Sequence, residues 1–357
     1  HRMDEMFPVR TVTAAATPYE FPDGDPITLP ASFVYKDKQV DTEAFLTETD
    51  TSALLVLKDG EVVFERYMLT GGRYEQWLSM SVAKSYVSAL IGIAVEEGHI
   101  KSIEEAVTDY LPELAGSAYD GVRIKDVLQM SSGAAWNEDY SDPESDINRF
   151  GRIFALGGSF NEFTKTLTRA TEPGTVNHYN SSDTQVLGAL LVRATGRTIT
   201  DYMQEKIWTP IGAESEAFWL IDSDGMEMAF AGFNATARDY AKLGELFRNG
   251  GNWQGKQIVP ADWARASVTP DAPHLQPGIA EDTHLPVGYG YQWWVMDGDE
   301  GEYSGIGVYN QFVYVNPTDN VVIVKLSAMS DYGKDLEESS YREYETIHLF
   351  RAIADNS

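Results

Sequence analysis

The chain has 357 residues, too many for one small hydrophobic core, and this length favours two interlocked domains. Apolar residues make up 43% of it, which indicates a folded globular protein and excludes a disordered one. The 55 acidic residues outnumber the 27 basic ones, and the formal charge of −28 argues against nucleic acid and anionic membrane surfaces as partners.

The cysteine and histidine content narrows the possible chemistry. The chain has no cysteine, so neither a disulfide nor a thiolate can form, and its six histidines lack metal-ligand spacing. We therefore expect no metal and no other cofactor. No apolar stretch is long enough to span a membrane. The first eight residues do not resemble a signal peptide, and we favour a periplasmic or secreted location after leader removal over a cytoplasmic one.

The first third of the chain is predicted to contain a β-hairpin followed by a buried helix. Residues 1–45 are proline-rich and weakly patterned. Two β-rich runs, 53–58 and 61–67, flank an Asp-Gly turn, which is a hairpin signature. Most positions of 82–95 are apolar on every side of a helical wheel, and this pattern predicts a buried helix rather than an amphipathic one.

The middle of the chain is predicted to be helical, and the last third returns to strands. Residues 103–225 carry helical and loop-like patterns. An amphipathic helix follows, and then strands that we expect to pair as an antiparallel meander before a closing helix. The expected helices are 124–130, 183–194, 200–208, the amphipathic 237–247 and the closing 336–354, and the expected strands are 289–295, 311–315 and 321–326.

Strands at both ends with helices between them predict an α/β protein of the α+β kind, with an antiparallel sheet flanked by helices. The sheet domain would be discontinuous and would contain residues 1–80 and 226–357. A mainly helical inserted domain would occupy residues 81–225. We expect the active site to lie between the two.

Ser81 and Lys84 are the first candidates for chemistry. Ser81 is the one serine with a lysine three residues later, a spacing that places both on the same helical face. A lone buried ammonium is costly, so Lys84 needs a partner or a lowered pKa. A hydroxyl beside an amine that accepts its proton is an activated nucleophile. The alternative is a capping serine followed by a lysine that reaches the surface. A cap at Ser79 instead would leave Ser81 free for chemistry.

Further segments, taken with Ser81 and Lys84, resemble the serine β-lactamases and penicillin-binding proteins of the class C type, together with their esterase and amidase relatives. The likeness extends from the hairpin to the last helix and implies a β-lactamase/transpeptidase-like fold. These segments are Gln-Met-Ser-Ser-Gly at 129–133, Tyr-Asn-Ser at 179–181, and Gly-Ile-Gly at 305–307, which is expected to open a strand.

The chain is most similar to the branch of this family that contains the nylon-oligomer (6-aminohexanoate-dimer) hydrolases and esterases. The segments 138–143 and 304–308, followed by Gln311, carry this likeness. The branch implies that Tyr140 closes a loop over the substrate, whereas the alternative is an exposed loop aromatic. Trp136 lies in the same polar and aromatic loop, and we expect it to line the cleft.

The resemblance also implies catalytic roles. Ser81 would attack an acyl carbonyl to form an acyl-enzyme, with Lys84 either neutral or holding Tyr179 as a phenolate. Tyr179 would relay the proton to the leaving group and activate water, although a core tyrosine is the alternative. The backbone N–H groups of Ser81 and Val308 are the implied oxyanion donors.

Two departures from the family pattern bear on the substrate. Ser181 stands where the family carries Asn, and Gly305 and Ile306 stand where it carries Lys and Thr. We expect these three residues and Gly307 to contact the substrate, with the glycines permitting its close approach or forming an ordinary strand bulge. The missing lysine removes an anchor for a β-lactam carboxylate, so we expect weak or no β-lactamase activity.

The sequence therefore predicts a cofactor-free serine hydrolase, monomeric or homodimeric, that acts on small-molecule esters or amides. One alternative is a non-catalytic penicillin-binding-like sensor or interaction protein, which the intact Ser81, Lys84 and Tyr179 disfavour. Another is a D-alanyl peptidase or β-lactamase, which the missing lysine disfavours.

Overall fold

A seven-stranded antiparallel sheet forms the centre of the protein. The computed structural model describes residues 2–69, 71–278 and 286–357. The N-terminal and C-terminal thirds of the chain meet in this sheet, where β15 pairs with β4 and Val324 lies opposite Leu55. In spatial order the strands are β11 (Gly288–Tyr289), β12 (Trp294–Val295), β13 (Tyr303–Gly307), β14 (Gln311–Asn316), β15 (Val321–Ser327), β4 (Thr51–Lys58) and β5 (Glu61–Tyr67).

The strand predictions are confirmed for the hairpin near residue 60 but not for the segment 289–295. The β4–β5 hairpin is confirmed, and Asp59 and Gly60 have the positive φ angles of 52° and 81° that its tight turn requires. The single strand predicted over 289–295 is wrong, because β11 and β12 are two short strands that pair with each other. The chain reverses between them, where Gln292 has a φ of 62°.

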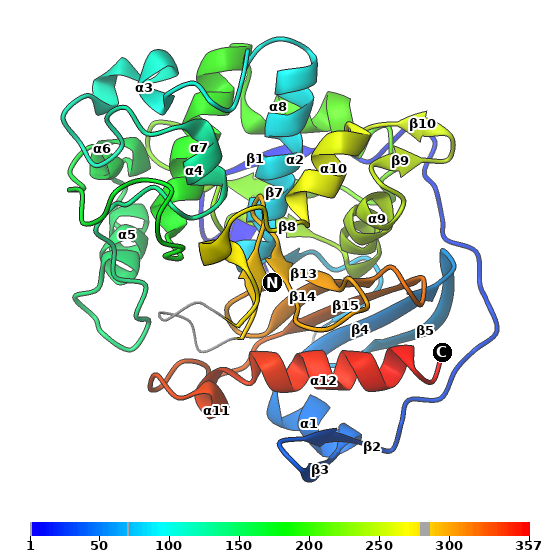
Figure 1. The fold of residues 1–357 in the computed structure, drawn as a ribbon. Helices are drawn as coiled ribbons and strands as arrows, with labels where there is room; N and C mark the ends of the chain where they lie inside the picture. The colour runs from blue at the N-terminus through cyan, green and yellow to red at the C-terminus, as the bar shows by residue number, and fades with distance from the viewer. Residues whose placement is uncertain (1, 70, 279–285) are drawn as a thin grey trace.

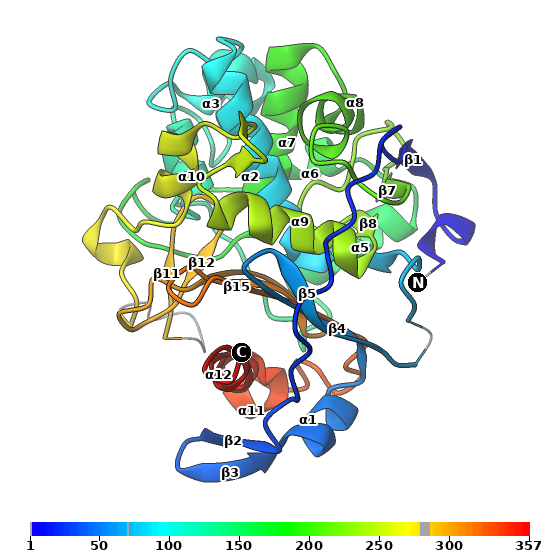
Figure 2. The same cartoon turned by 90° about the vertical axis from the view of Figure 1, so that its right-hand side faces the viewer.

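Helices cover both faces of this sheet. Figure 1 shows α12 (Glu343–Ala354) along one face, and the turned view in Figure 2 shows α9 (Ala237–Arg248) on the opposite side. The Phe350 ring of α12 lies 5.3 Å from that of Phe312. The closing helix predicted over 336–354 is broken into α11 (Glu338–Tyr341) and α12, because Arg342 between them adopts a φ of 55°.

Helix α2 (Ala83–Glu96) is the buried helix that the sequence predicts. Every residue from 83 to 94 is buried, polar ones included. The helix packs so tightly that a Cβ on Gly92 would lie 2.4 Å from the Trp263 ring. It ends before Gly98, which has a φ of 77°.

The helical middle of the chain gathers at one end of the molecule in Figure 1. Helix α7 (Ser181–Thr195) ends at Gly196, whose φ of 68° gives the left-handed cap. Domain boundaries at 80/81 and 225/226 stay a prediction. The remaining helices are α1 (Thr42–Glu48), α3 (Val107–Tyr110), α4 (Ile124–Leu128), α5 (Asp146–Ala155), α6 (Phe160–Thr164), α8 (Ile199–Met203), which continues into a π-helical turn at Gln204–Trp208, and α10 (Ala261–Ser267).

The proline-rich start of the chain contains strands that the sequence pattern did not reveal. Short strand β1 (Val9–Val12) pairs with β7 in a second sheet. Its partner lies about 200 residues further along the chain, so local sequence pattern does not reveal this strand. That sheet runs β1, β7 (Ala217–Leu220), β8 (Phe233–Ala235) and β6 (Trp77–Leu78), and two small hairpins are β2 (Ser32–Tyr35) with β3 (Lys38–Asp41) and β9 (Asn252–Trp253) with β10 (Lys256–Gln257).

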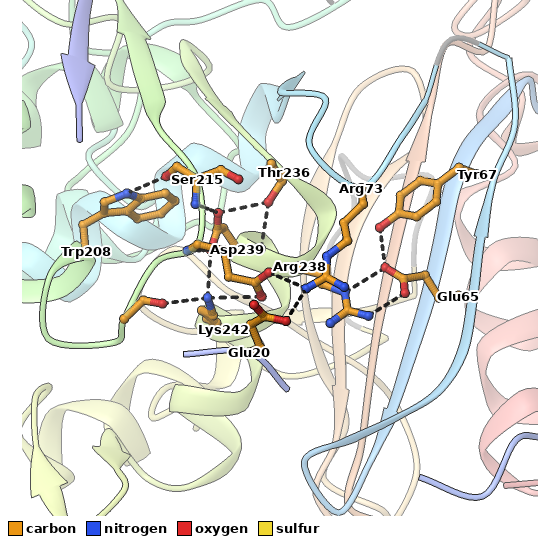
Figure 3. Close-up of polar contacts among 12 residues, drawn as sticks. Glu20, Glu65, Tyr67, Arg73, Trp208, Ser215, Thr236, Arg238, Asp239 and Lys242 are labelled. Carbon is orange, nitrogen blue, oxygen red and sulfur yellow. Dashed lines mark hydrogen bonds and ion pairs between the residues drawn. The ribbon is translucent and has the colours of Figure 1, made fainter. Parts of the chain in front are cut away.

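The amphipathic helix predicted over 237–247 is confirmed as α9, but every one of these residues is buried. Its polar side chains are paired within the protein rather than exposed (Figure 3). The Lys242 ammonium donates to Asp239 at 3.0 Å, and the Arg238 guanidinium donates to Glu65 at 2.6 and 2.8 Å. Segments distant in sequence cover the polar side of this helix, so a pattern typical of a surface helix occurs inside the protein.

The antiparallel sheet and its flanking helices confirm the predicted α/β fold class. Among the helices of the described residues, none has the length and apolarity needed to cross a membrane.

Candidate active site

Ser81 lies in a single 3₁₀ turn, Met80–Val82, that leads directly into α2. Met80 has a φ of 47°, a strained value that turns the chain sharply before the helix. The hydroxyl of Ser79 donates to the Met80 carbonyl at 3.1 Å and makes no capping bond, so the option of a side-chain cap at Ser79 is wrong. Ser81 is buried apart from 7% of its surface.

Lys84 is enclosed beside Ser81 and does not reach the surface. Its side chain is only 1% exposed, which contradicts the alternative of a lysine that extends into solvent. The Nζ atom lies 2.8 Å from Ser81 Oγ, 2.9 Å from the Phe230 carbonyl oxygen and 3.2 Å from Ser181 Oγ. Burial lowers the pKa of Lys84 to about 7, although the nearby Glu138 charge opposes the shift. A substantial fraction of Lys84 is therefore neutral at pH 7.

Tyr179 contacts the same pair of residues. Its side chain interacts with Ser81, and its ring centre lies 5.0 Å from Lys84 Nζ. The ring stacks on Trp294 with a centroid distance of 5.1 Å, which fixes its orientation. Burial raises the pKa of Tyr179 well above its usual value, and the Glu138 charge adds to this effect. Its hydroxyl therefore keeps its proton at neutral pH.

Ser181 is packed behind Lys84 rather than against the open space of the site. Asn180 caps α7 by accepting a bond from the Ser182 N–H at 2.8 Å, and this cap places Ser181 at the first position of the helix. Ser181 is 1% exposed, and its Oγ atom lies within bonding distance of both Lys84 and Glu138. The substrate contact of Ser181 stays a prediction, and in the structure its hydroxyl contacts the candidate base.

A cavity of about 360 Å³ opens in front of Ser81 and Tyr179. Trp136 and Tyr140, both predicted, line it, and so do Ile306 and Val308 from the end of β13. The acidic side chains in its wall are Glu138, Asp139 and Glu343, and no described residue that lines it is a lysine or arginine. The cavity is thus aromatic and acidic.

The glycines of the third segment face the protein interior, not the cavity. They close β13 instead of opening a strand. A Cβ on Gly307 would lie 2.5 Å from the Ser79 carbonyl oxygen and 3.0 Å from the Ser81 nitrogen. One on Gly305 would meet Ser85 Oγ at 3.4 Å. Close approach of β13 to the Ser81 turn, rather than of the substrate, explains why position 307 carries glycine.

Replacing Gly307 by alanine should therefore damage the site directly. The added methyl group would push β13 away from the Ser81 turn and separate the two backbone N–H groups proposed for the oxyanion. We expect kcat to fall roughly 100-fold, comparable to loss of one oxyanion donor. Steady-state kinetics would measure the loss. Gly305→Ala is the matched control, because its Cβ makes an ordinary contact, and an equal loss in both variants would contradict this explanation.

A buried polar cluster supports the turn that follows Gly307. Tyr309 and Asn310 have φ angles of 63° and 73°. The Lys325 ammonium donates to Asn310 Oδ1 at 2.6 Å, and Gln311 Nε2 donates to the Val308 carbonyl at 3.3 Å. These bonds hold the turn that follows Val308. Gln311 could be singled out from the sequence, but Lys325 could not, because its contacts come from strand pairing.

Glu138 is the other residue that the sequence analysis did not select as a site residue. Its carboxylate lies between the candidate base and the cavity, 2.7 Å from Ser181 Oγ and 2.8 Å from the Tyr140 hydroxyl. Its position between Trp136 and Tyr140, in the polar and aromatic loop expected to line the cleft, was the sequence feature that pointed to it.

Elsewhere, the carboxylates of Glu300, Asp319 and Asp355 approach within 4.8 Å of one another and could hold a cation, but they do not line this cavity. Such acidic surface groups are common without an ion.

Comparison with known proteins shows the family of this chain. Residues 43–345 match the family described as Beta-lactamase. The chain belongs to the β-lactamase family. A 6-aminohexanoate-dimer hydrolase of Paenarthrobacter ureafaciens is 33% identical over 298 residues, which cover 82% of this chain and 76% of that protein. The family and this relative make the protein an enzyme, a serine hydrolase of ester or amide bonds.

Solved structures share the fold. One from Bacillus anthracis, described as a 6-aminohexanoate-dimer hydrolase, has a TM-score of 0.86 at 24% identity and covers 98% of this chain and 92% of its own. EstCE1, a hydrolase with promiscuous acyltransferase activity, has a TM-score of 0.67 at 17% identity and covers 88% and 96%. Proteins described with different activities thus have the same architecture as this chain.

Proposed function

We propose that the protein cleaves small esters or amides through an acyl-enzyme on Ser81, as a carboxylesterase or an amidase of the 6-aminohexanoate-oligomer type. The observation that carries this proposal is the 2.8 Å contact between Ser81 Oγ and a buried Lys84 Nζ at the wall of an aromatic cavity. A neutral amine at this distance can accept the serine proton as the hydroxyl attacks a carbonyl carbon.

The pKa directions favour Lys84 over Tyr179 as the resting base. Burial lowers the pKa of Lys84 to about 7, while it raises that of Tyr179 well above its usual value. Lys84 would take the Ser81 proton. The Tyr179 hydroxyl would give its proton to the leaving group as it takes the proton back from the Lys84 ammonium, so that neither group keeps a net change. The Ser81 and Val308 N–H groups would stabilise the oxyanion. Water would then release the acid by the reverse proton path.

The charge of the cavity bears on the substrate. Glu138, Asp139 and Glu343 line it, so a carboxylate beside the scissile bond would be repelled, whereas a neutral or ammonium-bearing substrate would be accepted. An amide with a free amino end, as in an aminohexanoate oligomer, fits this charge. A β-lactam carboxylate finds no lysine or arginine among the described residues that line the cavity, where His178 is the one basic side chain, and Ile306 offers only apolar surface.

We expect kcat/KM for p-nitrophenyl butyrate to exceed that for nitrocefin by at least about 100-fold. An unpaired buried carboxylate loses roughly 3–5 kcal/mol relative to a paired one, enough for such a ratio. Both substrates should be measured at one pH and ionic strength, because salt screens charges beyond roughly 8 Å.

A neutral ester of nitrocefin is the matched control compound. If the carboxylate causes the discrimination, blocking it should raise kcat/KM toward that of the simple ester. Nitrocefin turnover equal to or faster than ester turnover would overturn the proposed preference and identify a β-lactamase.

A further inference from the structure

We propose that Glu138 is a positioning residue that acts through Ser181 to aim the lone pair of Lys84 at the Ser81 hydroxyl. The inference rests on the proposed function, because it assumes that neutral Lys84 is the base. It assigns a task to Glu138 and explains why a hydroxyl at position 181 can stand where the family carries an amide.

The four hydrogen bonds of Glu138 require it to be an acceptor at each contact. The Ser181 backbone N–H donates to Oε2 at 3.0 Å, and the Trp136 indole N–H donates to the same oxygen. The Tyr140 hydroxyl donates to Oε1 at 2.8 Å, and the Ser181 hydroxyl donates to Oε1 at 2.7 Å. A carboxylate accepts all four bonds without conflict.

The direction of the Ser181 proton then fixes the protons of Lys84. Because Ser181 gives its only hydroxyl proton to Glu138, its oxygen must accept from Lys84 Nζ, which lies 3.2 Å away. The Phe230 carbonyl oxygen, 2.9 Å from Nζ, can only accept as well. A neutral amine has two hydrogens, and these two acceptors use both. The remaining lone pair faces Ser81 Oγ at 2.8 Å.

In this arrangement the first step balances within the site. The Ser81 O–H bond breaks as the oxygen forms a bond to the carbonyl carbon, and the proton moves onto the Lys84 lone pair to give an ammonium. The carbonyl electron pair moves to the oxyanion. If Lys84 instead donated a hydrogen to Ser81 Oγ, the same two atoms would lie at the same distance with the wrong polarity for catalysis.

The substitution at position 181 makes Glu138 necessary. The oxygen of an asparagine amide is an acceptor in every orientation, so it would orient the lysine without help. A serine hydroxyl can rotate and donate to Lys84, which would occupy the lone pair. Glu138 prevents this rotation, and its contact with Ser181 joins residues 43 positions apart.

Replacing Glu138 by glutamine tests the inference. The two N–H donors at Oε2 would hold the amide oxygen on their side, so the amide NH₂ would face Ser181 Oγ. Ser181 would then turn its proton toward Lys84. We expect the high-pH plateau of kcat for p-nitrophenyl butyrate to fall by about 100-fold, a typical contribution of a positioned general base.

The pH profile separates this role from a simple loss of charge. The Glu138 charge raises the pKa of Lys84 against the larger effect of burial. Removing that charge therefore lowers the pKa of Lys84 and leaves more of the base neutral at low pH. The acid limb of the profile then moves to lower pH. Loss of charge alone cannot reduce the plateau at pH 9, where Lys84 is mostly neutral in both proteins.

A double-mutant cycle with Ser181→Ala shows whether Glu138 acts through Ser181. If it does, Glu138→Gln should have little further effect on the plateau once Ser181 is alanine. Glu227→Gln is the matched control for the loss of a buried carboxylate, because Glu227 accepts bonds from both the N–H and the hydroxyl of Thr200, at 3.1 and 2.8 Å. It should lower the melting temperature but leave the plateau intact.

The outcomes are distinguishable. An unchanged plateau in Glu138→Gln, or independent effects of the two substitutions in the cycle, would overturn the role of Glu138 while leaving the proposed function standing. Ester hydrolysis by Ser81→Ala at the wild-type rate would instead overturn the proposed function. If Glu138→Gln fails to fold, the Ser181→Ala plateau decides the matter, because an undiminished plateau there excludes any action through Ser181.

Discussion

Replacing Ser81 by alanine is expected to lower kcat for p-nitrophenyl butyrate by roughly 10⁴-fold or more, because the variant has no nucleophile to form the acyl-enzyme. Ser81 Oγ is the atom that Lys84 Nζ and the Tyr179 side chain both contact, so no neighbouring hydroxyl can replace it in the same geometry. Intact mass spectrometry after treatment with a fluorophosphonate should show one adduct on the wild type and none on the variant.

Ser88→Ala is the matched control for this experiment. Ser88 lies farther along the same helix, is also buried, and its hydroxyl has no partner among the described residues. Its removal should leave the fluorophosphonate adduct and the turnover unchanged. Turnover by Ser81→Ala within about tenfold of the wild type, with the fold intact, would rule out Ser81 as the nucleophile.

The proximity of Ser81 and Lys84 could be predicted because they lie three residues apart where a 3₁₀ turn leads directly into α2, and local helical geometry sets their separation. The β4–β5 hairpin could be predicted for a similar reason, since its Asp59-Gly60 turn is local. Both inferences need only the residues between the two partners.

The contacts of Glu138 and Lys325 could not be predicted in this way. Glu138 reaches Ser181 across 43 residues, and Lys325 reaches Asn310 through the pairing of β14 with β15. The burial of α9 has the same origin, because Glu65, whose carboxylate pairs with Arg238, lies 173 residues away. Sequence periodicity records the polarity of a side chain, but it does not record which distant segment covers it.

Replacing Lys84 should be about as damaging as replacing Ser81, because the two residues act as one unit and their effects are not additive. We expect Lys84→Ala to lose roughly 10⁴-fold in kcat. Lys84→Arg should not restore it, since a guanidinium does not release its proton in proteins and cannot act as the base. Steady-state kinetics of both variants over pH 5–9 would measure this.

The wild-type pH profile provides the complementary test. Burial lowers the pKa of Lys84 to about 7, so kcat/KM should fall as pH decreases through that value and the amine gains a proton. Lys242→Arg is the control for a buried lysine outside the site, since Lys242 is fully buried and donates to the Gly212 carbonyl at 2.9 Å and to Asp239 (Figure 3). It should alter the melting temperature but keep the acid limb near pH 7. A Lys84→Arg enzyme with near-normal turnover would show that position 84 needs only a positive charge, and the general-base role of Lys84 would then have to be abandoned.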